Sequence, residues 1–363
     1  MIRSTVLIIA IAVAQGAFAR GDLPGRAPGT LTQNFAPSPY SVEVTADFAE
    51  VSNLSASSLG LTAQVISPID MPGIVLRLPA AGVTIPAAFP VIVDITPPAL
   101  GGLEFEGVAM VILDTPDLPY SPYSRLRLFS AHDGGPFVDI TEEFSEGSYR
   151  VRGSQGEFSE FLIVLDERDP AAIVTTKFAR LSALIATHTI AIDDTVEATL
   201  TGLLSSAQAS FTVNDIDAAK VDIAAFEAAV AATTSGQVPN LWRSLEDVTN
   251  VNGLLRAAAG TLYFSLEDAR DTDLDGLYDW QDNCRDIANP AQCDTDGDGF
   301  GNICDGDFDG NNIINSFDLT AMRNAFGSAG VTDTDLDCDG MTNSFDLSLF
   351  RELFGSPPGP GIP

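Results

Sequence analysis

The stretch D-T-D-L-D-G-L-Y-D-W-Q-D-N-C, from Asp271 to Cys284, decides how the C-terminal part of the chain folds. Five aspartates stand two to four positions apart, and a cysteine closes the run. Carboxylates this close repel one another unless a cation lies between them. Counted from Asp271, the aspartates occupy positions 1, 3, 5, 9 and 12, and Gly276 occupies position 6. This spacing predicts a twelve-residue calcium loop, in which those five side chains and the carbonyl of residue 7 supply oxygens and residue 6 makes a sharp turn.

The same spacing recurs three times, which gives a first loop (271–282), a second (294–305), a third (307–318) and a fourth (335–346). The side-chain ligands predicted by this spacing are Asp271, Asp273, Asp275, Asp279, Asp282, Asp294, Asp296, Asp298, Asn302, Asp305, Asp307, Asp309, Asn311, Asn315, Asp318, Asp335, Asp337, Asp339, Asn343 and Asp346. The predicted carbonyl ligands at position 7 are those of Leu277, Phe300, Ile313 and Met341. Position 6 is glycine except for Asn312, and asparagine tolerates a left-handed backbone. We therefore expect about four calcium ions, the only cofactor that the pattern implies.

The charge of the chain supports a cationic ligand. Residues 271–355 hold 18 aspartates and one glutamate against three arginines, so their net charge is −16. This is half of the formal net charge of −32 of the 363-residue chain. Phosphate binding needs a basic surface, so nucleic acid is excluded as a partner. A divalent cation is the natural counter-charge.

The N-terminus M-I-R-S-T-V-L-I-I-A-I-A-V-A-Q-G-A-F-A is typical of a secretory signal peptide. Arg3 supplies the positive region, Val6 to Ala14 the apolar region, and Ala17-Phe18-Ala19 the cleavage signal. The apolar run is short for a bilayer span, and no later run reaches about 20 apolar residues. We expect a secreted or surface-held protein without a membrane span, cleaved near Ala19.

All four cysteines lie in the acidic segment 271–355: Cys284, Cys293, Cys304 and Cys338. Export permits disulfides, and the absence of a C-x-x-C pair argues against a metal–thiolate site. Four cysteines allow three pairings, among which the residues alone do not choose.

The first two loops, with their D-N-C, N-P-A-Q and terminal C-D elements, resemble thrombospondin type 3 repeats. These repeats wrap the chain around calcium with little apolar core. In that family the cysteine of D-N-C bridges to the cysteine before the closing aspartate, so the resemblance implies Cys284–Cys304. Cys293 is an addition to the family pattern, and its predicted partner is Cys338.

The last two loops belong to an internal duplication, D-F-D-G-N-N-I-I-N-S-F-D-L-T-A-M-R-N-A-F-G-S against D-L-D-C-D-G-M-T-N-S-F-D-L-S-L-F-R-E-L-F-G-S. Each copy runs from a loop into a helix, and the pair resembles a type I dockerin, an EF-hand-like module of two loop–helix segments. Dockerins attach secreted enzymes to cohesin modules, which implies a cohesin-like or other extracellular protein as partner. Positions 10 and 11, which help to choose the cohesin, are Ser316, Phe317, Ser344 and Phe345. The two phenylalanines fit either a partner surface or the core between the helices.

The remainder of the chain predicts a multidomain protein. Residues 1–19 are the signal peptide, 20–38 a Gly/Pro-rich linker, 39–168 a β-sandwich of short strands, and 170–268 an Ala-rich α-helical spacer bundle. Residues 271–305 are the calcium repeats, 306–355 the dockerin-like domain and 356–363 a disordered Pro/Gly tail. Ala219, Ile223, Phe226 and Val230 form one helical stripe, which suits the core of the bundle better than a groove for a partner helix.

No hydrolase, metalloprotease or nucleotide-binding motif appears in the chain. The carboxylates Glu104, Glu106, Glu142 and Glu143 are glycosidase candidates by residue type only, and His132 and His188 are incidental. We expect a non-catalytic, calcium-binding, docking protein. The alternatives are a polysaccharide-binding or polysaccharide-cleaving sandwich, which exposed Tyr120, Tyr123 and Phe137 would favour, and a purely structural calcium-stiffened stalk.

Overall fold

The computed structural model describes residues 26–361, apart from residues 80, 122–123 and 146–147. The expected signal peptide and Tyr123 lie outside the described residues. Within that part of the chain, no helix has the length and apolar character needed to cross a bilayer.

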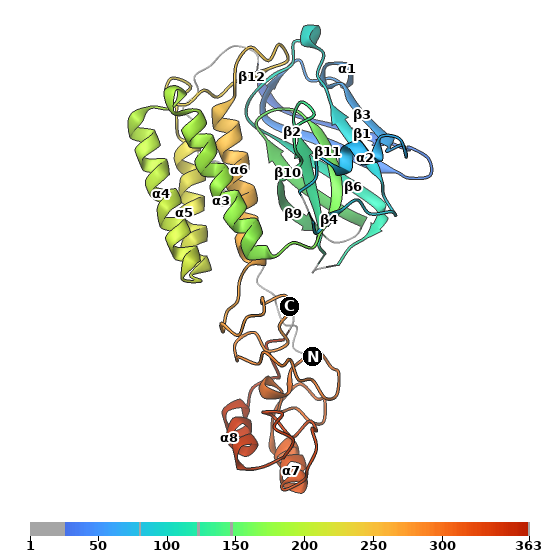
Figure 1. Ribbon diagram of the computed structural model, residues 1–363, viewed down its shortest axis with the longest axis vertical. Helices are drawn as coiled ribbons and strands as arrows, with labels where there is room; N and C mark the ends of the chain where they lie inside the picture. Colours follow the sequence, from blue (N-terminus) through green and yellow to red (C-terminus); the bar gives the residue numbers. More distant parts are fainter. Residues whose placement is uncertain (1–25, 80, 122–123, 146–147, 362–363) are drawn as a thin grey trace.

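Two six-stranded antiparallel sheets form a sandwich (Figure 1). The first sheet has the order β1 (Ala27–Phe35), β2 (Val42–Ser52), β6 (Glu104–Pro119), β10 (Ser148–Gln155) and β9 (Thr141–Ser145), and β12 (Trp242–Arg243) pairs with β6. The second has the order β3 (Leu61–Val65), β5 (Val91–Ile95), β11 (Glu160–Asp166), β7 (Leu126–Ala131) and β8 (Val138–Asp139), and β4 (Val83–Thr84) pairs with β11. Three short helical segments connect strands: α1 (Ala56–Leu59), α2 (Met71–Val75) and the 3₁₀ turn η1 (Ala99–Gly101).

The core between the sheets is rich in aromatic side chains. Phe48, Phe105 and Phe158 contact one another, and Trp242 stacks on Phe105 with ring centroids 5.3 Å apart. Alternate residues of β2 and β6 point into this core, as the period of two in a half-buried strand requires.

The predicted linker 20–38 is wrong for residues 27–35. These residues form β1, which pairs with β2 along its whole length. Pro28 and Gly29 suggested an irregular segment. Gly29 instead lies against Val51, where a Cβ atom would come within 2.7 Å of the valine side chain, so the small residue lets the edge strand approach.

Four helices form the bundle: α3 (Pro170–Thr187), α4 (Asp194–Thr212), α5 (Ile216–Ala231) and α6 (Val251–Asp268), with the 3₁₀ turn η2 (Thr189–Ala191) between α3 and α4. Asp169, Asp193, Asp215 and Asn250 cap their N-termini with side-chain oxygens. The predicted stripe on α5 is buried in the bundle core, so it offers no groove to a partner.

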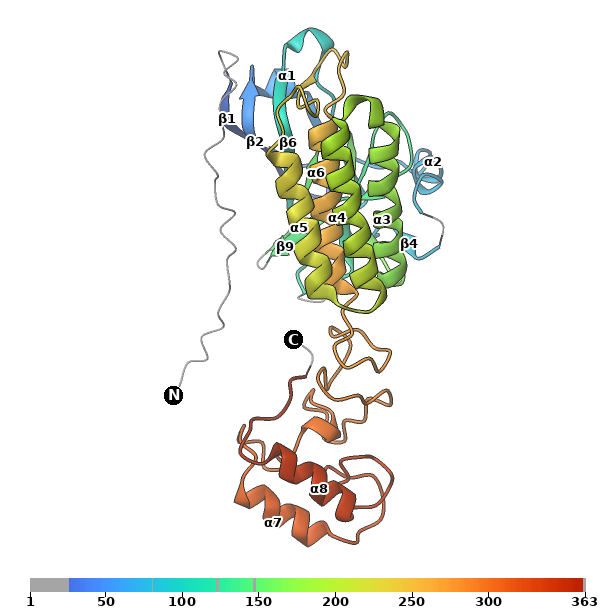
Figure 2. The same cartoon turned by 90° about the vertical axis from the view of Figure 1, so that its left-hand side faces the viewer.

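The bundle packs directly on the sandwich and is not a spacer. Helix α6 lies against β6, β9 and β10, and Figures 1 and 2 show the helices side by side with the sheets. A Cβ atom at Gly253 of α6 would lie 2.4 Å from the carbonyl oxygen of Gly107 in β6, so glycine permits this contact. Trp242, which follows the bundle helix α5 in sequence, belongs to the sandwich core. The two parts therefore form one structural unit.

The acidic segment extends from one end of this unit (Figure 2). Its regular elements are the 3₁₀ turn η3 (Asn302–Cys304) and helices α7 (Ser316–Ala325) and α8 (Ser344–Leu353). Four buried side chains, Ile314, Met322, Leu336 and Phe350, form its small core. Such a core is too small to order the segment alone, so the loops need another source of stability.

The C-terminal residues 356–361 differ from the expected disordered tail. The carbonyl of Cys304 accepts a hydrogen bond from the Gly359 amide, and the carbonyl of Pro360 accepts one from Arg285. The ring of Phe300 lies so close to Gly359 that a Cβ atom there would come within 2.6 Å of it. The tail thus returns to the second loop, because glycine lets the backbone fit against an aromatic ring.

Candidate calcium sites

The four predicted loops share one backbone conformation. Positions 4 and 6 of every loop have positive φ, at Leu274 and Gly276, Gly297 and Gly299, Gly310 and Asn312, and Cys338 and Gly340. The turn at position 6 was predicted from glycine and Asn312. The left-handed conformation at position 4 was not predicted, because leucine and cysteine, which stand there in two loops, rarely adopt a positive φ.

The carboxylate at position 1 organises each loop. The two oxygens of Asp271 accept hydrogen bonds from the amides of Leu274 (2.8 Å) and Gly276 (3.1 Å). Asp294 does the same for Gly297 and Gly299. In the third and fourth loops, Asp307 and Asp335 accept bonds from the amides of positions 5 and 6. The same short-range bonds therefore curl all four loops around a common centre.

Each loop brings three carboxylates together, with ligand oxygens within 4.8 Å of one another. The first two groups take positions 1, 3 and 5, and the last two take positions 1, 3 and 12. These groups are Asp271, Asp273 and Asp275; Asp294, Asp296 and Asp298; Asp307, Asp309 and Asp318; and Asp335, Asp337 and Asp346.

No basic side chain neutralises these groups. All ion pairs formed by the described residues lie at or before Arg270. Burial, together with the neighbouring carboxylates of Asp275 and Asp282, raises the pKa of Asp273 to about 6. Burial likewise raises the pKa of Asp305 to about 7, with help from Asp298 and Asp296. Such shifts show how poorly the protein alone accommodates the negative charge.

The donor set fits a hard divalent cation. The Oδ2 atom of Asp273 is shielded from solvent and accepts no hydrogen bond within the described chain, and this residue belongs to the carboxylate group of the first loop. Carboxylate and carbonyl oxygens are the ligands of calcium, which takes six to eight of them in flexible geometry. Calcium would supply the counter-charge in these four loops.

The side chains at position 9 are turned toward the backbone of their own loops. Both oxygens of Asp279 accept hydrogen bonds from Thr272, and the oxygen of Asn302 accepts one from the Thr295 amide. Asn315 and Asn343 cap α7 and α8 by accepting from the amides two residues later. The sequence pattern predicted these four as ligands, and the structure gives each a positioning contact.

Position 12 differs between the two kinds of loop. Asp318 and Asp346 join their carboxylate groups and also accept hydrogen bonds from the position 9 amides, at 2.8 and 2.7 Å. Asp282 and Asp305 lie outside the groups of three and bind the amides of Cys284 and Asp307. Among the carbonyls predicted at position 7, those of Ile313 and Met341 accept bonds from the asparagine at position 9.

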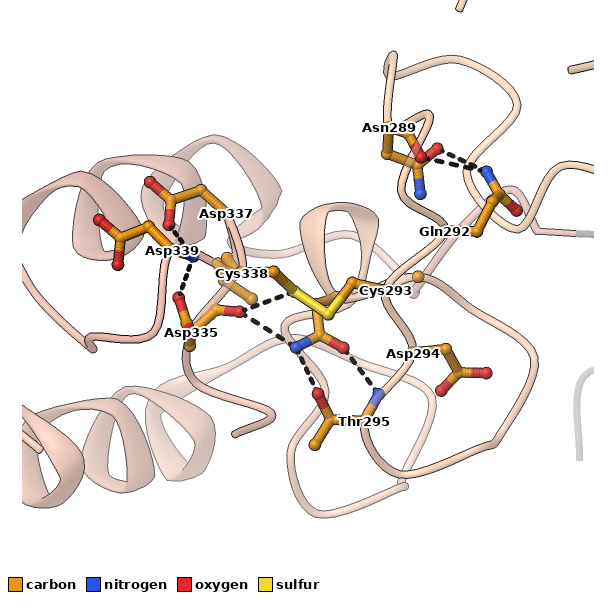
Figure 3. Close-up of a disulfide and its surroundings, with 12 residues drawn as sticks. Asn289, Gln292, Cys293, Asp294, Thr295, Asp335, Asp337, Cys338 and Asp339 are labelled. Carbon is orange, nitrogen blue, oxygen red and sulfur yellow. Dashed lines mark hydrogen bonds between the residues drawn. A yellow bond between two sulfur atoms is a disulfide. The ribbon is translucent and has the colours of Figure 1, made fainter. Parts of the chain in front are cut away.

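Two disulfides brace the loops, and in both the connectivity is the one expected. Cys284, two residues after the first loop, bonds to Cys304 of the second loop. Cys293 bonds to Cys338 and so joins the second loop to the fourth (Figure 3). The segments 271–305 and 306–355 are therefore covalently cross-linked and are not independent modules.

The residues predicted to choose a partner lie on the surface. Phe317 and Phe345 are 72% and 71% exposed, which excludes the alternative of a core between the helices. Ser316 and Ser344 are the first residues of α7 and α8. The duplicated helices thus present two equivalent Ser-Phe pairs to solvent.

A shallow groove of about 320 Å³ separates α7 from α8. Leu319, Leu347, Phe350 and Phe354 line it together with Arg323 and Arg351. Neither arginine forms an ion pair within the described residues. The groove therefore combines an apolar floor with two positive charges, in the most acidic part of the chain.

The glycosidase candidates form ion pairs and hydrogen bonds with neighbouring residues of the fold. Glu104 and Glu106 both pair with Arg26, and Glu143 pairs with Arg152. Glu142 accepts two hydrogen bonds from Ser154, and its carboxylate lies against α6. His132 bonds through Nδ1 to the carbonyl of Phe158.

A model of a family of unknown function, DUF6689, matches residues 30–270. The chain belongs to this family. The match covers the sandwich and the bundle together, in agreement with their packing as one unit. A thrombospondin type 3 repeat model matches residues 269–292, which hold the first loop.

This DUF6689 protein therefore carries a calcium-binding element directly after its family domain. The thrombospondin repeat and the two disulfides are consistent with an extracellular protein. No dockerin model matches residues 306–355, and no curated protein matches the chain.

Proposed function

We propose that this protein is a non-catalytic exported protein whose acidic segment docks, in the presence of calcium, to a cohesin-like or other extracellular protein. The observation that carries the proposal is the duplicated helix pair, which exposes Phe317 and Phe345 to solvent. The residue after each phenylalanine, Asp318 or Asp346, belongs to the carboxylate group of its loop. Phenylalanine is enriched at protein–protein interfaces, so two exposed copies related by internal duplication support an interaction surface.

Calcium binding would control this surface through the helix starts. Asp318 and Asp346 belong to the carboxylate groups of the third and fourth loops and also close the capping boxes of α7 and α8. Without a cation, repulsion within each group would pull this residue away from the cap. The direction in which each phenylalanine points therefore depends on calcium.

The partner should carry an apolar patch edged by carboxylates. Arg323 and Arg351 flank the groove beside Phe354, and neither has an acidic partner in the described chain. Complementary charges at the edge of an interface favour association with the correct partner. The strongly negative remainder of the segment would repel surfaces without such a pattern.

The test is a capture experiment with the full exported chain as bait and secreted and surface proteins of the source organism as prey. We expect a partner that is retained in millimolar calcium and lost in EDTA. The double variant F317A/F345A should lose it, whereas I190A, which truncates a fully exposed isoleucine of the bundle, should retain it. Retention of the partner by F317A/F345A would refute the proposed surface, and capture of nothing would favour a calcium-stiffened stalk.

We do not propose a polysaccharide site. Of the aromatic residues that would have favoured one, Phe137 is 1% exposed and packs in the apolar cluster beside α2. Tyr120 is half-buried and packs against Phe144 with ring centroids 6.3 Å apart. Binding sites for sugars need exposed aromatic faces, which Phe137 does not supply.

A further inference from the structure

The second and fourth loops are joined by contacts that the first loop lacks. In the first loop, the side chain at position 9 is Asp279, and it bonds only to Thr272 of the same loop. In the second loop the equivalent residue is Asn302, whose Oδ1 and Nδ2 make the matching bonds to Thr295. Asparagine has amide hydrogens to donate, and a carboxylate has none.

The Asn302 amide reaches across to the fourth loop. Its Nδ2 atom lies 3.0 Å from the carbonyl oxygen of Asp335 and 3.1 Å from that of Thr332. Asn302 is 5% exposed and Asp335 is fully buried, so water does not compete for these bonds. Each such bond favours the joined arrangement about fivefold.

Asp335 is the organising residue of the fourth loop. Its carboxylate accepts hydrogen bonds from the amides of Asp339 and Gly340 and belongs to the carboxylate group of that loop. The second loop therefore holds the main chain of the residue whose side chain shapes the fourth loop.

The disulfide between Cys293 and Cys338 reinforces the same connection. Cys293 directly precedes Asp294, the first ligand of the second loop, and Cys338 stands between Asp337 and Asp339 (Figure 3). Its left-handed backbone, with φ of 56°, is part of the turn at position 4. Ordering either loop thus restricts the backbone of the other.

We propose that the second and fourth loops bind calcium as a coupled pair, with Asn302 as the positioning residue that carries the coupling. The inference rests on the proposed calcium binding. A cation that orders one loop also fixes the hydrogen bonds between the Asn302 amide and the carbonyls of Thr332 and Asp335. The other loop is then partly ordered before its own ion binds. The coupling is reciprocal: an ion in either loop raises the affinity of the other loop for calcium by the same factor.

The test measures hydrogen–deuterium exchange in the full chain, with intact disulfides, across a series of free calcium concentrations. Peptides covering residues 294–305 and 335–346 report the calcium midpoint of each loop. The variant N302D keeps the oxygen that accepts from Thr295 and removes the donor to Asp335 and Thr332. We expect it to raise the midpoint of the fourth loop about five- to thirtyfold, the factor that the loss of one or both of these bonds implies.

The matched control is D279N, which makes the reverse exchange at position 9 of the first loop, where no bond crosses to another loop. It should leave the midpoint of the fourth loop within twofold of the unchanged protein. The variant D337N, which weakens the fourth loop itself, should raise the midpoint of the second loop, and this effect should be smaller in N302D, where only the disulfide still connects the two loops. Equal protection of N302D and the unchanged protein in saturating calcium would establish that the variant folds.

Two results would overturn the coupling: a fourth-loop midpoint that N302D leaves unchanged, or an equal shift in D279N. Loops that gain protection independently would refute the coupling and leave calcium binding intact. If no loop gains protection with calcium, the proposed calcium binding fails first and the coupling fails with it.

Discussion

A buried ion pair fastens the bundle to the sandwich, and removing one partner should destabilise the whole family domain. The Nζ atom of Lys177 in α3 lies 2.6 Å from Oδ2 of Asp139 in β8, and the side chains are 6% and 3% exposed. The lysine also donates to the hydroxyls of Thr261 and Ser265 in α6. The pair therefore connects one strand to two helices, through groups that water does not reach.

The substitution K177M leaves the Asp139 carboxylate buried without its cation. Its Oδ2 atom has no other hydrogen-bond partner among the described residues, so Arg127 remains only as a nearby charge and no hydrogen bond replaces that of the lysine. Breaking a buried pair in this way costs about 3–5 kcal/mol, a large part of the roughly 5–15 kcal/mol that stabilises a typical domain. The double variant K177M/D139L removes both charges and should recover most of this loss.

The assay is urea unfolding at fixed calcium, followed by fluorescence in a W280F background so that Trp242 in the sandwich core reports alone. The matched control is K220M, which breaks the more exposed pair with Glu267 and should cost about 0–1 kcal/mol. A loss below about 1 kcal/mol in K177M, or a double variant as unstable as the sum of the two single variants, would refute the reasoning.

Three further outcomes are expected. Burial raises the pKa of Glu142 to about 7, so the folded domain binds an extra proton and should lose stability as pH rises from about 4.5 through 7. The variant E142Q should remove roughly 3 kcal/mol of this dependence, measured by urea unfolding at several pH values. G253A, whose new Cβ would meet the Gly107 carbonyl, should lower the free energy of unfolding by about 2 kcal/mol or more, whereas G202A, with open space around it, should raise it by about 0.5–1 kcal/mol. Chelation of calcium should abolish hydrogen-exchange protection across residues 271–355 and leave the bundle helices protected; unchanged protection in EDTA would count against calcium-coupled folding.

The parts of the fold that depend on local spacing could be predicted from the sequence. Asp271 and Gly276 could be assigned to one loop because the bonds from the Asp271 carboxylate end within six residues. Contacts between distant residues could not be predicted in this way. In the sequence Asn302 matches only the pattern of a calcium ligand, and its contact with Asp335 depends on the fold. Nothing in the sequence near Lys177 indicates Asp139 as its partner. The edge strand β1 was missed because Gly29 is an irregular signal locally and a packing requirement once Val51 lies against it.

The disulfide between Cys293 and Cys338 also determines how the acidic segment would carry mechanical load. A pull applied at α8 and resisted by the family domain travels from Ser344 to Cys338 and crosses the sulfur bridge to Cys293. The 44 residues between the two cysteines, including the entire third loop, lie outside this path. At about 3.3–3.6 Å per extended residue, roughly 150 Å of chain is thereby withheld from stretching. A partner pulling on α8 would therefore strain the first and fourth loops and leave the third loop slack.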